Sequence, residues 1–254
     1  MNPEFQEARR FLKSPINTPA DIMDSDEDRK VEAPPLQKTY PEDAKLIDLV
    51  STAELSMGSM SFVDVLRKRR SRRKYTDEAL TLEEVSFLLW AVQGIRRVSK
   101  KAPATYRTVP ASGGIHPFET YLVINRVTGV NVGLYRYLPL EHKLFFLKQI
   151  SSEWLEQLAY ACRGQDFVST GAVVFIWTVI PYRTEWRYAN EAHKSIALAS
   201  GHVCQNLYLA SEAIGAGTCA ITAYAQRVMD TLLGVDGERE FTIYVAPVGK
   251  VRSR

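Results

Sequence analysis

Seven of the eight residues from Arg67 to Lys74 are cationic, and the eighth, Ser71, is a small hydroxyl residue. The positive charges of such a run repel one another, so its presence needs an explanation. It could be a solvated tail, a nucleic-acid or targeting patch, or a binding site for a dianionic phosphate. Arginine presents planar, paired donors that match phosphate oxygens. The surrounding sequence agrees best with the phosphate socket.

The basic run lies between two predicted helices. The stretch before it, residues 61–66, predicts a short helix whose apolar face is made of Phe62, Val65 and Leu66. After it, Thr81 and Glu84 form a capping box that opens a second helix. We therefore expect the run to be a short connection between two core-facing helices and not a tail.

Two further segments offer groups that suit the same kind of ligand. Residues 109–119 contain Ser112 and the pair Gly113-Gly114, which lets the backbone approach a flat ligand closely. Near the end of the chain, Lys250 and Arg252 share a face at strand spacing. Together the three segments offer what an anionic cofactor with a planar ring requires.

Composition limits the classes of protein that the chain can represent. With 254 residues and 46% hydrophobic residues it can bury a proper core, and its net charge of +3 is not that of a nucleic-acid polycation. Its three cysteines, Cys162, Cys204 and Cys219, form no CxxC pair, which argues against a disulfide framework or a metal site. No apolar run approaches the roughly 20 residues that span a bilayer, so we expect a cytoplasmic protein.

Hydrophobic patterning predicts an α+β fold, with a mixed, mainly antiparallel sheet flanked by helices, over residues 61–254. Residues 1–60, rich in proline and acidic residues, are expected to form an extended or disordered arm. Strands are predicted at residues 120–124, 133–137, 143–147, 172–180 and 241–248. Helices are predicted at residues 152–162, 191–214 and 226–233, and Gly215 and Gly217 are expected to stop the long one.

In several ordered stretches the chain resembles the flavin-dependent nitroreductase-fold proteins. More closely, it is similar to the branch of azoline-oxidising SagB/ThcOx-type dehydrogenases of ribosomal peptide biosynthesis. The matching stretches lie between Ser61 and Arg252 and comprise residues 69–73, 90–95, 106–119, 133–137, 201–207, 215–221 and 247–250.

The resemblance implies a homodimer with FMN bound at the subunit interface. It implies that the flavin phosphate and pyrimidine edge are held by Arg69, Arg70, Ser71 and Arg73, with Lys250 and Arg252 completing the phosphate socket. The ring and ribityl chain would be covered from the partner subunit by Pro110, Ala111, Ser112 and Gly113. The other face of the ring would lie against the segment made of Cys219, Ala220, Ile221 and Thr222.

The chemistry implied is a two-electron, ping-pong cycle through the flavin N5, with no metal. Reduced flavin gains negative charge near N1 and O2, so a nearby cation favours hydride acceptance. The chain has no GxGxxG motif, so NADH or NADPH would bind transiently over the flavin. The substrate is unassigned among nitroaromatic, quinone and azoline-type compounds. Thr222 stands where relatives commonly have glycine, and positions 193 and 195 also depart from the branch, which weighs against azoline oxidation more than against flavin binding.

Lys194 and Tyr188 are the side-chain candidates for proton handling, because they precede the core of the long helix on the expected substrate side. His116 is a lone histidine, which is more often structural than catalytic. His202 and Asn206 face the same way on that helix, as packing residues or flavin contacts. An aromatic group could line an apolar pocket or belong to the core; it comprises Trp177, Tyr182, Trp186 and Tyr188.

Two alternatives stay open. A nucleic-acid-binding protein would use the basic run from Arg67 to Lys74. Its affinity for DNA or RNA would fall steeply with salt concentration, and the purified protein would be colourless. A relative that has lost catalysis, or that consumes flavin, would be yellow without turnover.

Overall fold

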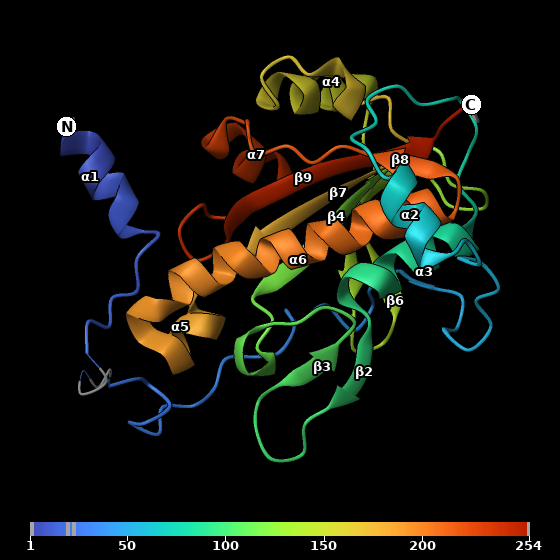
Figure 1. The fold of residues 1–254 in the computed structure, drawn as a ribbon. Coiled ribbons are helices and arrows are strands. Elements are labelled where there is room, and N and C mark those ends of the chain that lie inside the picture. Colours follow the sequence, from blue (N-terminus) through green and yellow to red (C-terminus); the bar gives the residue numbers. More distant parts are fainter. Residues whose placement is uncertain (1–2, 19–20, 22–23, 253–254) are drawn as a thin grey trace.

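A seven-stranded sheet lies at the centre of the computed structural model, which describes residues 3–18, 21 and 24–252 (Figure 1). Its strand order is β1-β6-β5-β4-β7-β9-β8, and the described ladders between neighbouring strands are all antiparallel. Among the described residues parallel pairing is confined to isolated bridges such as Ser71 with Thr218, so the prediction of a mainly antiparallel sheet is confirmed. The sheet strands are β1 (Leu46–Asp48), β4 (Phe118–Ile124), β5 (Gly133–Leu138), β6 (Lys143–Lys148), β7 (Val173–Val179), β8 (Ala216–Thr218) and β9 (Phe241–Lys250).

Helices cover both faces of the sheet. Alternate side chains of β7 point to opposite faces, so Phe175 and Trp177 pack in the layer with α3 and α6, whereas Val174 and Ile176 pack in the layer with α4 and α7. Because both faces are buried, β7 reads as an unbroken apolar run, as predicted. The helices are α1 (Pro3–Arg10), α2 (Phe62–Lys68), α3 (Leu82–Gln93), α4 (Ser152–Ala161), α5 (Tyr182–Tyr188), α6 (Ala192–Ala213) and α7 (Gln226–Leu233).

The helix and strand predictions from residue 61 onward are confirmed within a few residues at each end. The capping box of α3 is present in both halves: Thr81 Oγ1 accepts from Glu84 N, and Glu84 Oε2 accepts from Thr81 N. The basic run does connect α2 to α3. The expectation that Phe62 and Leu66 face the core is wrong, because they are 65% and 49% exposed while Val65 is buried.

Six elements were not predicted, namely α1, β1, β2, β3, α5 and β8. The hairpin β2 (Ile95–Val98) and β3 (Thr105–Arg107) forms a separate two-stranded sheet, and α5 precedes the long helix. Gly215, with φ of 69°, follows the long helix as expected, but Gly217 lies within β8 and is not a helix stop. No helix among the described residues is long and apolar enough to cross a membrane.

The N-terminal segment is extended over much of its length, but part of it belongs to the folded body. Residues 46–48 add β1 to the edge of the sheet, and Ser25 and Gln37 are buried. Trp186 Nε1 donates to Val31 O at 2.9 Å, and Arg136 Nη2 donates to Thr39 O at 2.7 Å. The expected arm therefore includes a strap, residues 24–41, that runs along α5 and the sheet. Positions 1–2, 19–20 and 22–23 of that arm lie outside the described residues.

Candidate functional site

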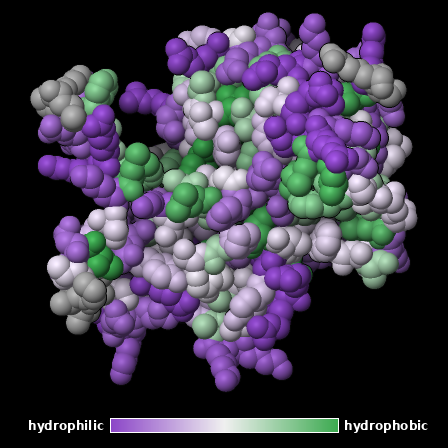
Figure 2. All heavy atoms as spheres, in the orientation of Figure 1, coloured by the Kyte–Doolittle hydropathy of each residue, from purple (hydrophilic) through white to green (hydrophobic). Residues whose placement is uncertain are grey.

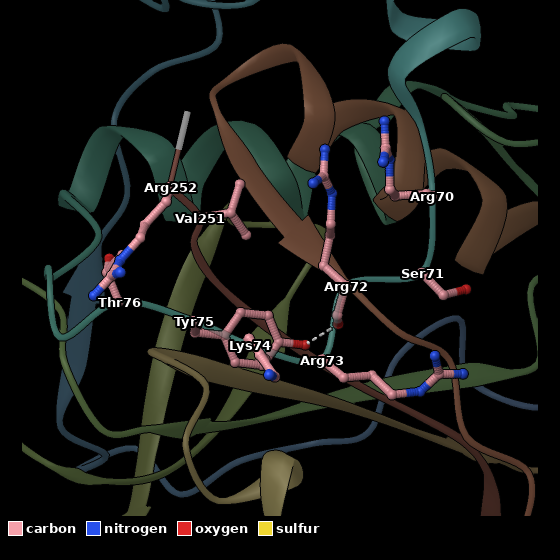
Figure 3. Close-up of a pocket in the computed structure, with 9 residues that line it drawn as sticks. All are labelled: Arg70, Ser71, Arg72, Arg73, Lys74, Tyr75, Thr76, Val251 and Arg252. Carbon is pink, nitrogen blue, oxygen red and sulfur yellow. Dashed lines mark hydrogen bonds between the residues drawn. The ribbon is translucent and has the colours of Figure 1, made fainter. Parts of the chain in front are cut away.

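The basic run lines a cavity of about 530 Å³ at the β8–β9 edge of the sheet (Figure 3). Its walls come from one continuous stretch, residues 70–76, and from Val251 and Arg252 after the last strand. The predicted cofactor residues Arg70, Ser71, Arg73 and Arg252 are thus brought together, and Arg72 and Lys74 join them. The cavity has the charge and the size that a phosphate-bearing ligand requires.

Two glycines let the run lie directly on the sheet edge. A Cβ at Gly217 would come within 2.4 Å of Arg72 Cγ, and a Cβ at Gly249 within 2.8 Å of Tyr75 Cγ, so a side chain at either position would displace the run. Arg72 N donates to Thr218 O at 2.9 Å, and Tyr75 Oη donates to Arg72 O at 2.8 Å. The backbone is therefore fixed where the cations gather.

Successive side chains of the run point in different directions. Ser71 and Arg73 extend to one side of the chain and Arg70 and Arg72 to another (Figure 3). Arg72 Nη2 pairs with Glu212 Oε1 at 3.3 Å, and its Nε is buried without a partner among the described residues. The Arg69 guanidinium lies over the Tyr208 ring at 5.4 Å. Glu212 thus offsets one cation, and most of the positive charge faces solvent or the cavity.

Lys250 has a different place from the one expected. Its ammonium pairs with Glu84 and donates to Ile214 O at 3.3 Å, and the Lys250 and Glu84 side chains are 16% and 10% exposed. Lys250 is not among the residues that line the cavity, whereas Arg252 is. The expected shared face is lost because β9 ends at Lys250, and Arg252 follows in irregular backbone.

Tyr208 of α6 joins the basic run to the segment that contains Cys219, Ala220, Ile221 and Thr222. Its hydroxyl lies 3.1 Å from Ser71 Oγ and accepts from Ala220 N at 2.8 Å. In that segment Cys219 and Ile221 are buried, and Thr222 is exposed. No sequence pattern pointed to Tyr208, because its hydroxyl contacts partners 137 and 12 positions away.

The segment with Pro110, Ala111, Ser112 and Gly113 lies near the other end of α6. Gly113 has a φ of 60°, and its carbonyl accepts from Arg187 Nη1 at 3.5 Å. A Cβ at Gly113 would lie 2.5 Å from Tyr188 Oη. The candidate Tyr188 is therefore beside this segment, and Lys194 follows in the first turn of α6.

The two halves of the predicted cofactor site are far apart within one chain. Tyr208 lies 16 residues beyond Ala192, the first residue of α6 (208 − 192). At 1.5 Å per residue this separation is about 24 Å along the helix. Gly113 and Tyr208 thus lie toward opposite ends of α6, whereas Thr108, just before Pro110, lines the same groove as Asn206.

The buried groups around the site titrate far from neutrality. Burial raises the pKa of Cys204 and of Tyr244 to about 12, and burial, with Cys219 and Tyr208 nearby, raises the pKa of Tyr75. Burial and the charge of Arg107 lower the pKa of His116 to about 2, so His116 is neutral at physiological pH. These groups are poor acid–base catalysts near pH 7.

The remaining candidates serve in packing. Asn206 Nδ2 donates to Ala91 O at 2.8 Å, which ties α6 to α3, and His202 is exposed. Trp177 lies in the core beside Phe175 and Tyr244. Trp186 and Tyr182 hold the strap, the latter by donating to Asp26 Oδ2 at 2.8 Å. The aromatic group does not form one pocket.

An apolar surface extends over α2, α3 and α6. Figure 2 shows hydrophobic residues over α2 amid hydrophilic neighbours, and Phe62, Val63 and Leu66 of this helix are exposed. A neighbouring groove of about 580 Å³ is lined mainly by apolar residues, among them Phe87, Trp90, Leu209 and Ala213. Exposed apolar surface of this extent marks an interaction site.

Comparison with known proteins identifies the class to which this fold and site belong. The profile of the nitroreductase family matches residues 66–250, so the chain belongs to the nitroreductase family, whose members are oxidoreductases. It is 32% identical over 187 residues to the nitroreductase-named protein MJ1384 of Methanocaldococcus jannaschii, covering 74% of this chain and 89% of that protein. The expected family and enzyme class are confirmed.

Solved structures show the same fold at low sequence identity. A nitroreductase from Anabaena variabilis superposes with a TM-score of 0.67 at 22% identity, covering 83% of this chain and 42% of that chain. This chain therefore spans less than half of that protein. A chain of the E. coli microcin synthetase McbBCD complex superposes with a TM-score of 0.59 at 15% identity, covering 99% of this chain and 87% of that chain. Neither the fold nor these comparisons support the nucleic-acid alternative.

Proposed function

We propose that the chain is an FMN-dependent oxidoreductase that works as a homodimer, with the phosphate of FMN held in the cavity of the basic run. The observation that carries this proposal is the concentration of Arg70, Arg73, Lys74 and Arg252 around one cavity that Ser71 also lines. A phosphate monoester carries nearly two negative charges at pH 7, and two or three guanidiniums match it.

The residues present fit FMN in two further respects. Gly217 and Gly249 permit the close approach of the run to β8 and β9, which places Ser71 beside Tyr208. The segment from Cys219 to Thr222 then continues from the same edge, where the N–H groups of Ala220 and Ile221 hold it in place by donating to Tyr208 Oη and Val245 O. FMN supplies the hydride chemistry, while Arg69 and Arg73 contribute positive charge at the pyrimidine edge.

A homodimer would complete the proposed site from two half-sites. A two-fold axis that pairs the α6 helices of two subunits would bring the segment of one subunit that contains Pro110, Ala111, Ser112 and Gly113 to the Tyr208 end of the other. The exposed apolar residues of α2 supply surface for such an interface. In this arrangement each ring is covered from both subunits and shielded from water.

The substrate site lies beside the partner's covering segment. A cavity of about 320 Å³ is lined by Pro110 and Ala111 on one side and by the β2–β3 hairpin on the other. Residues 85–118 contain five cations and no acidic residue, and Arg97 stacks on Tyr106 at 4.2 Å. We infer that this side admits an anionic donor such as NADPH, followed by a nitroaromatic, quinone or azoline-type acceptor in the same pocket.

Tyr188 and Lys194 are the proposed proton-handling residues. They lie at the α5–α6 junction, next to Gly113, so in the dimer they would face the partner's flavin from the substrate side. A lysine ammonium and a phenol can each supply a proton to a reduced acceptor. Substitution of either would then lower turnover more than FMN binding.

An absorbance spectrum of the purified protein, followed by anaerobic NADPH, tests the proposal. We expect flavin bands that bleach on reduction. Replacing both Arg69 and Arg73 by alanine should abolish FMN binding with the fold intact, whereas the matched control Arg227→Ala with Arg239→Ala, which removes two exposed cations elsewhere, should bind FMN normally. Colourless protein that takes up no added FMN would refute the proposal.

A further inference from the structure

A small cavity lies beneath the strap, away from the cationic cavity. Its volume is about 10 Å³, which is room for one particle of the size of a water molecule or slightly larger. Arg107, Arg183 and His116 line it from the body of the protein. The strap closes it with three apolar residues, Pro34, Pro35 and Leu36.

The buried charges around this cavity do not balance. Arg107, Arg136 and Arg183 are 3%, 4% and 4% exposed. Among the described residues they share one carboxylate, that of Glu119, which lies 2.6 Å from Arg183 Nη2 and 3.9 Å from Arg136 Nε. Nearby Lys38 is already matched by Glu240. Of the three guanidiniums only those of Arg107 and Arg183 line the cavity, and against the Glu119 carboxylate they leave one positive charge buried without a counter-charge, which is costly.

Two of these guanidiniums have unused donors. Arg183 Nη1 is buried and has no hydrogen-bond partner among the described residues. Arg136 Nε is likewise buried without a hydrogen-bond partner among the described residues, whereas Arg107 donates through Nε to Thr105 Oγ1 and through Nη1 to Gln93 Oε1. Burial and Arg183 lower the pKa of Arg107 to about 10, so Arg107 stays charged at pH 7.

We propose that this cavity binds a small monovalent anion, chloride, between Arg107 and Arg183. The size of the cavity excludes phosphate, sulfate and carboxylate ligands, and its walls contribute cations, a neutral histidine and apolar groups. The anion supplies the missing negative charge and accepts the unused N–H donor of Arg183. Because Leu36 and Ile115 line the same cavity, the anion also fastens the strap to the turn that follows Gly113.

Crystals grown in sodium bromide test the site directly. We expect an anomalous bromide peak between Arg107 and Arg183; a peak-free cavity that holds ordered water would overturn the proposal. In solution, the Tm measured in sodium chloride should be higher than the Tm measured in sodium gluconate at equal ionic strength. An anion at 100 times its dissociation constant should raise Tm by about 5–10 °C, and equal Tm values would count against it.

A matched pair of variants locates the effect. Arg183→Lys keeps a cation beside Glu119 but removes the second guanidinium donor, so the chloride-dependent rise in Tm should vanish. Arg187→Lys, on the same helix and outside the cavity lining, should retain it. A rise that survives in Arg183→Lys would refute the assignment, and if that variant fails to fold, the bromide peak of the unmodified protein decides. These readouts use FMN-free protein and are independent of the flavin proposal.

Discussion

Replacing Lys250 by methionine distinguishes a structural lysine from a phosphate ligand. The Lys250 ammonium pairs with Glu84, and both side chains are largely buried. Methionine retains an unbranched side chain but leaves the Glu84 carboxylate buried without its partner, which costs about 3–5 kcal/mol. At about 2–4 °C per kcal/mol for a chain of this size, we expect the Tm of FMN-free protein to fall by about 6–20 °C.

The assay compares thermal unfolding with FMN titration for two variants. Arg252→Met removes an exposed cation from the cavity, so its Tm should change by less than about 2 °C while FMN binds at least about tenfold more weakly. Adding Glu84→Gln to Lys250→Met removes the stranded charge and should recover a large part of the lost stability. A Lys250→Met protein with unchanged Tm and weakened FMN binding would refute the reasoning and make Lys250 a phosphate ligand.

Three further predictions concern the interface, pH and the thiols. Replacing Phe62 and Leu66 by aspartate should yield monomers by light scattering and weaken FMN binding, whereas Val132→Asp, at another exposed apolar position, should not; a persistent dimer would contradict the proposed interface. The pKa of His116 is about 2 in the folded protein and near 6.5 in the unfolded chain. The neutral imidazole therefore makes its full contribution to folding stability above pH 6.5, and this contribution is lost as the pH falls toward 2. His116→Asn should therefore reduce the slope of the unfolding free energy against pH, between pH 6 and 4, by up to about 1.4 kcal/mol per pH unit. Denaturant titrations at several pH values measure this slope, and an unchanged slope would exclude this account. Burial raises the pKa of Cys162 and Cys204 to about 12, so neither should react with a thiol reagent at pH 8 until the protein unfolds; rapid labelling of the native protein would show that they are accessible.

The sequence predicted best those elements whose signal is local. The α3 capping box needs residues three positions apart, and β7 needs its own unbroken apolar run. The basic run was also placed correctly between two helices. The hairpin was missed because β2 and β3 have only four and three residues. Arg96 and Arg97 of β2 are exposed and β3 ends in an arginine, so neither has the apolar alternation of a half-buried strand.

The errors depend on distant partners. An amphipathic pattern shows that α2 has an apolar face but does not say what covers it, and here that face is exposed on the single chain. The pairing of Lys250 with Glu84 joins positions 166 residues apart. β1 was missed in a proline-rich arm because its pairing with β6 is the interaction that makes it a strand.

The arrangement of the basic run couples ligand binding to local stability. Arg72 is offset by Glu212 and Arg69 lies against Tyr208, so these two residues hold the run in place without a ligand. Arg70, Arg73, Lys74 and Arg252 line one cavity that has no carboxylate in its lining, and their mutual repulsion opposes the fold although their side chains point in different directions. A bound dianion reverses the sign of that contribution, since it interacts with the folded arrangement and not with the separated cations of the unfolded chain. The same residues therefore select a phosphate-bearing ligand and make the β8–β9 edge more stable when it is bound.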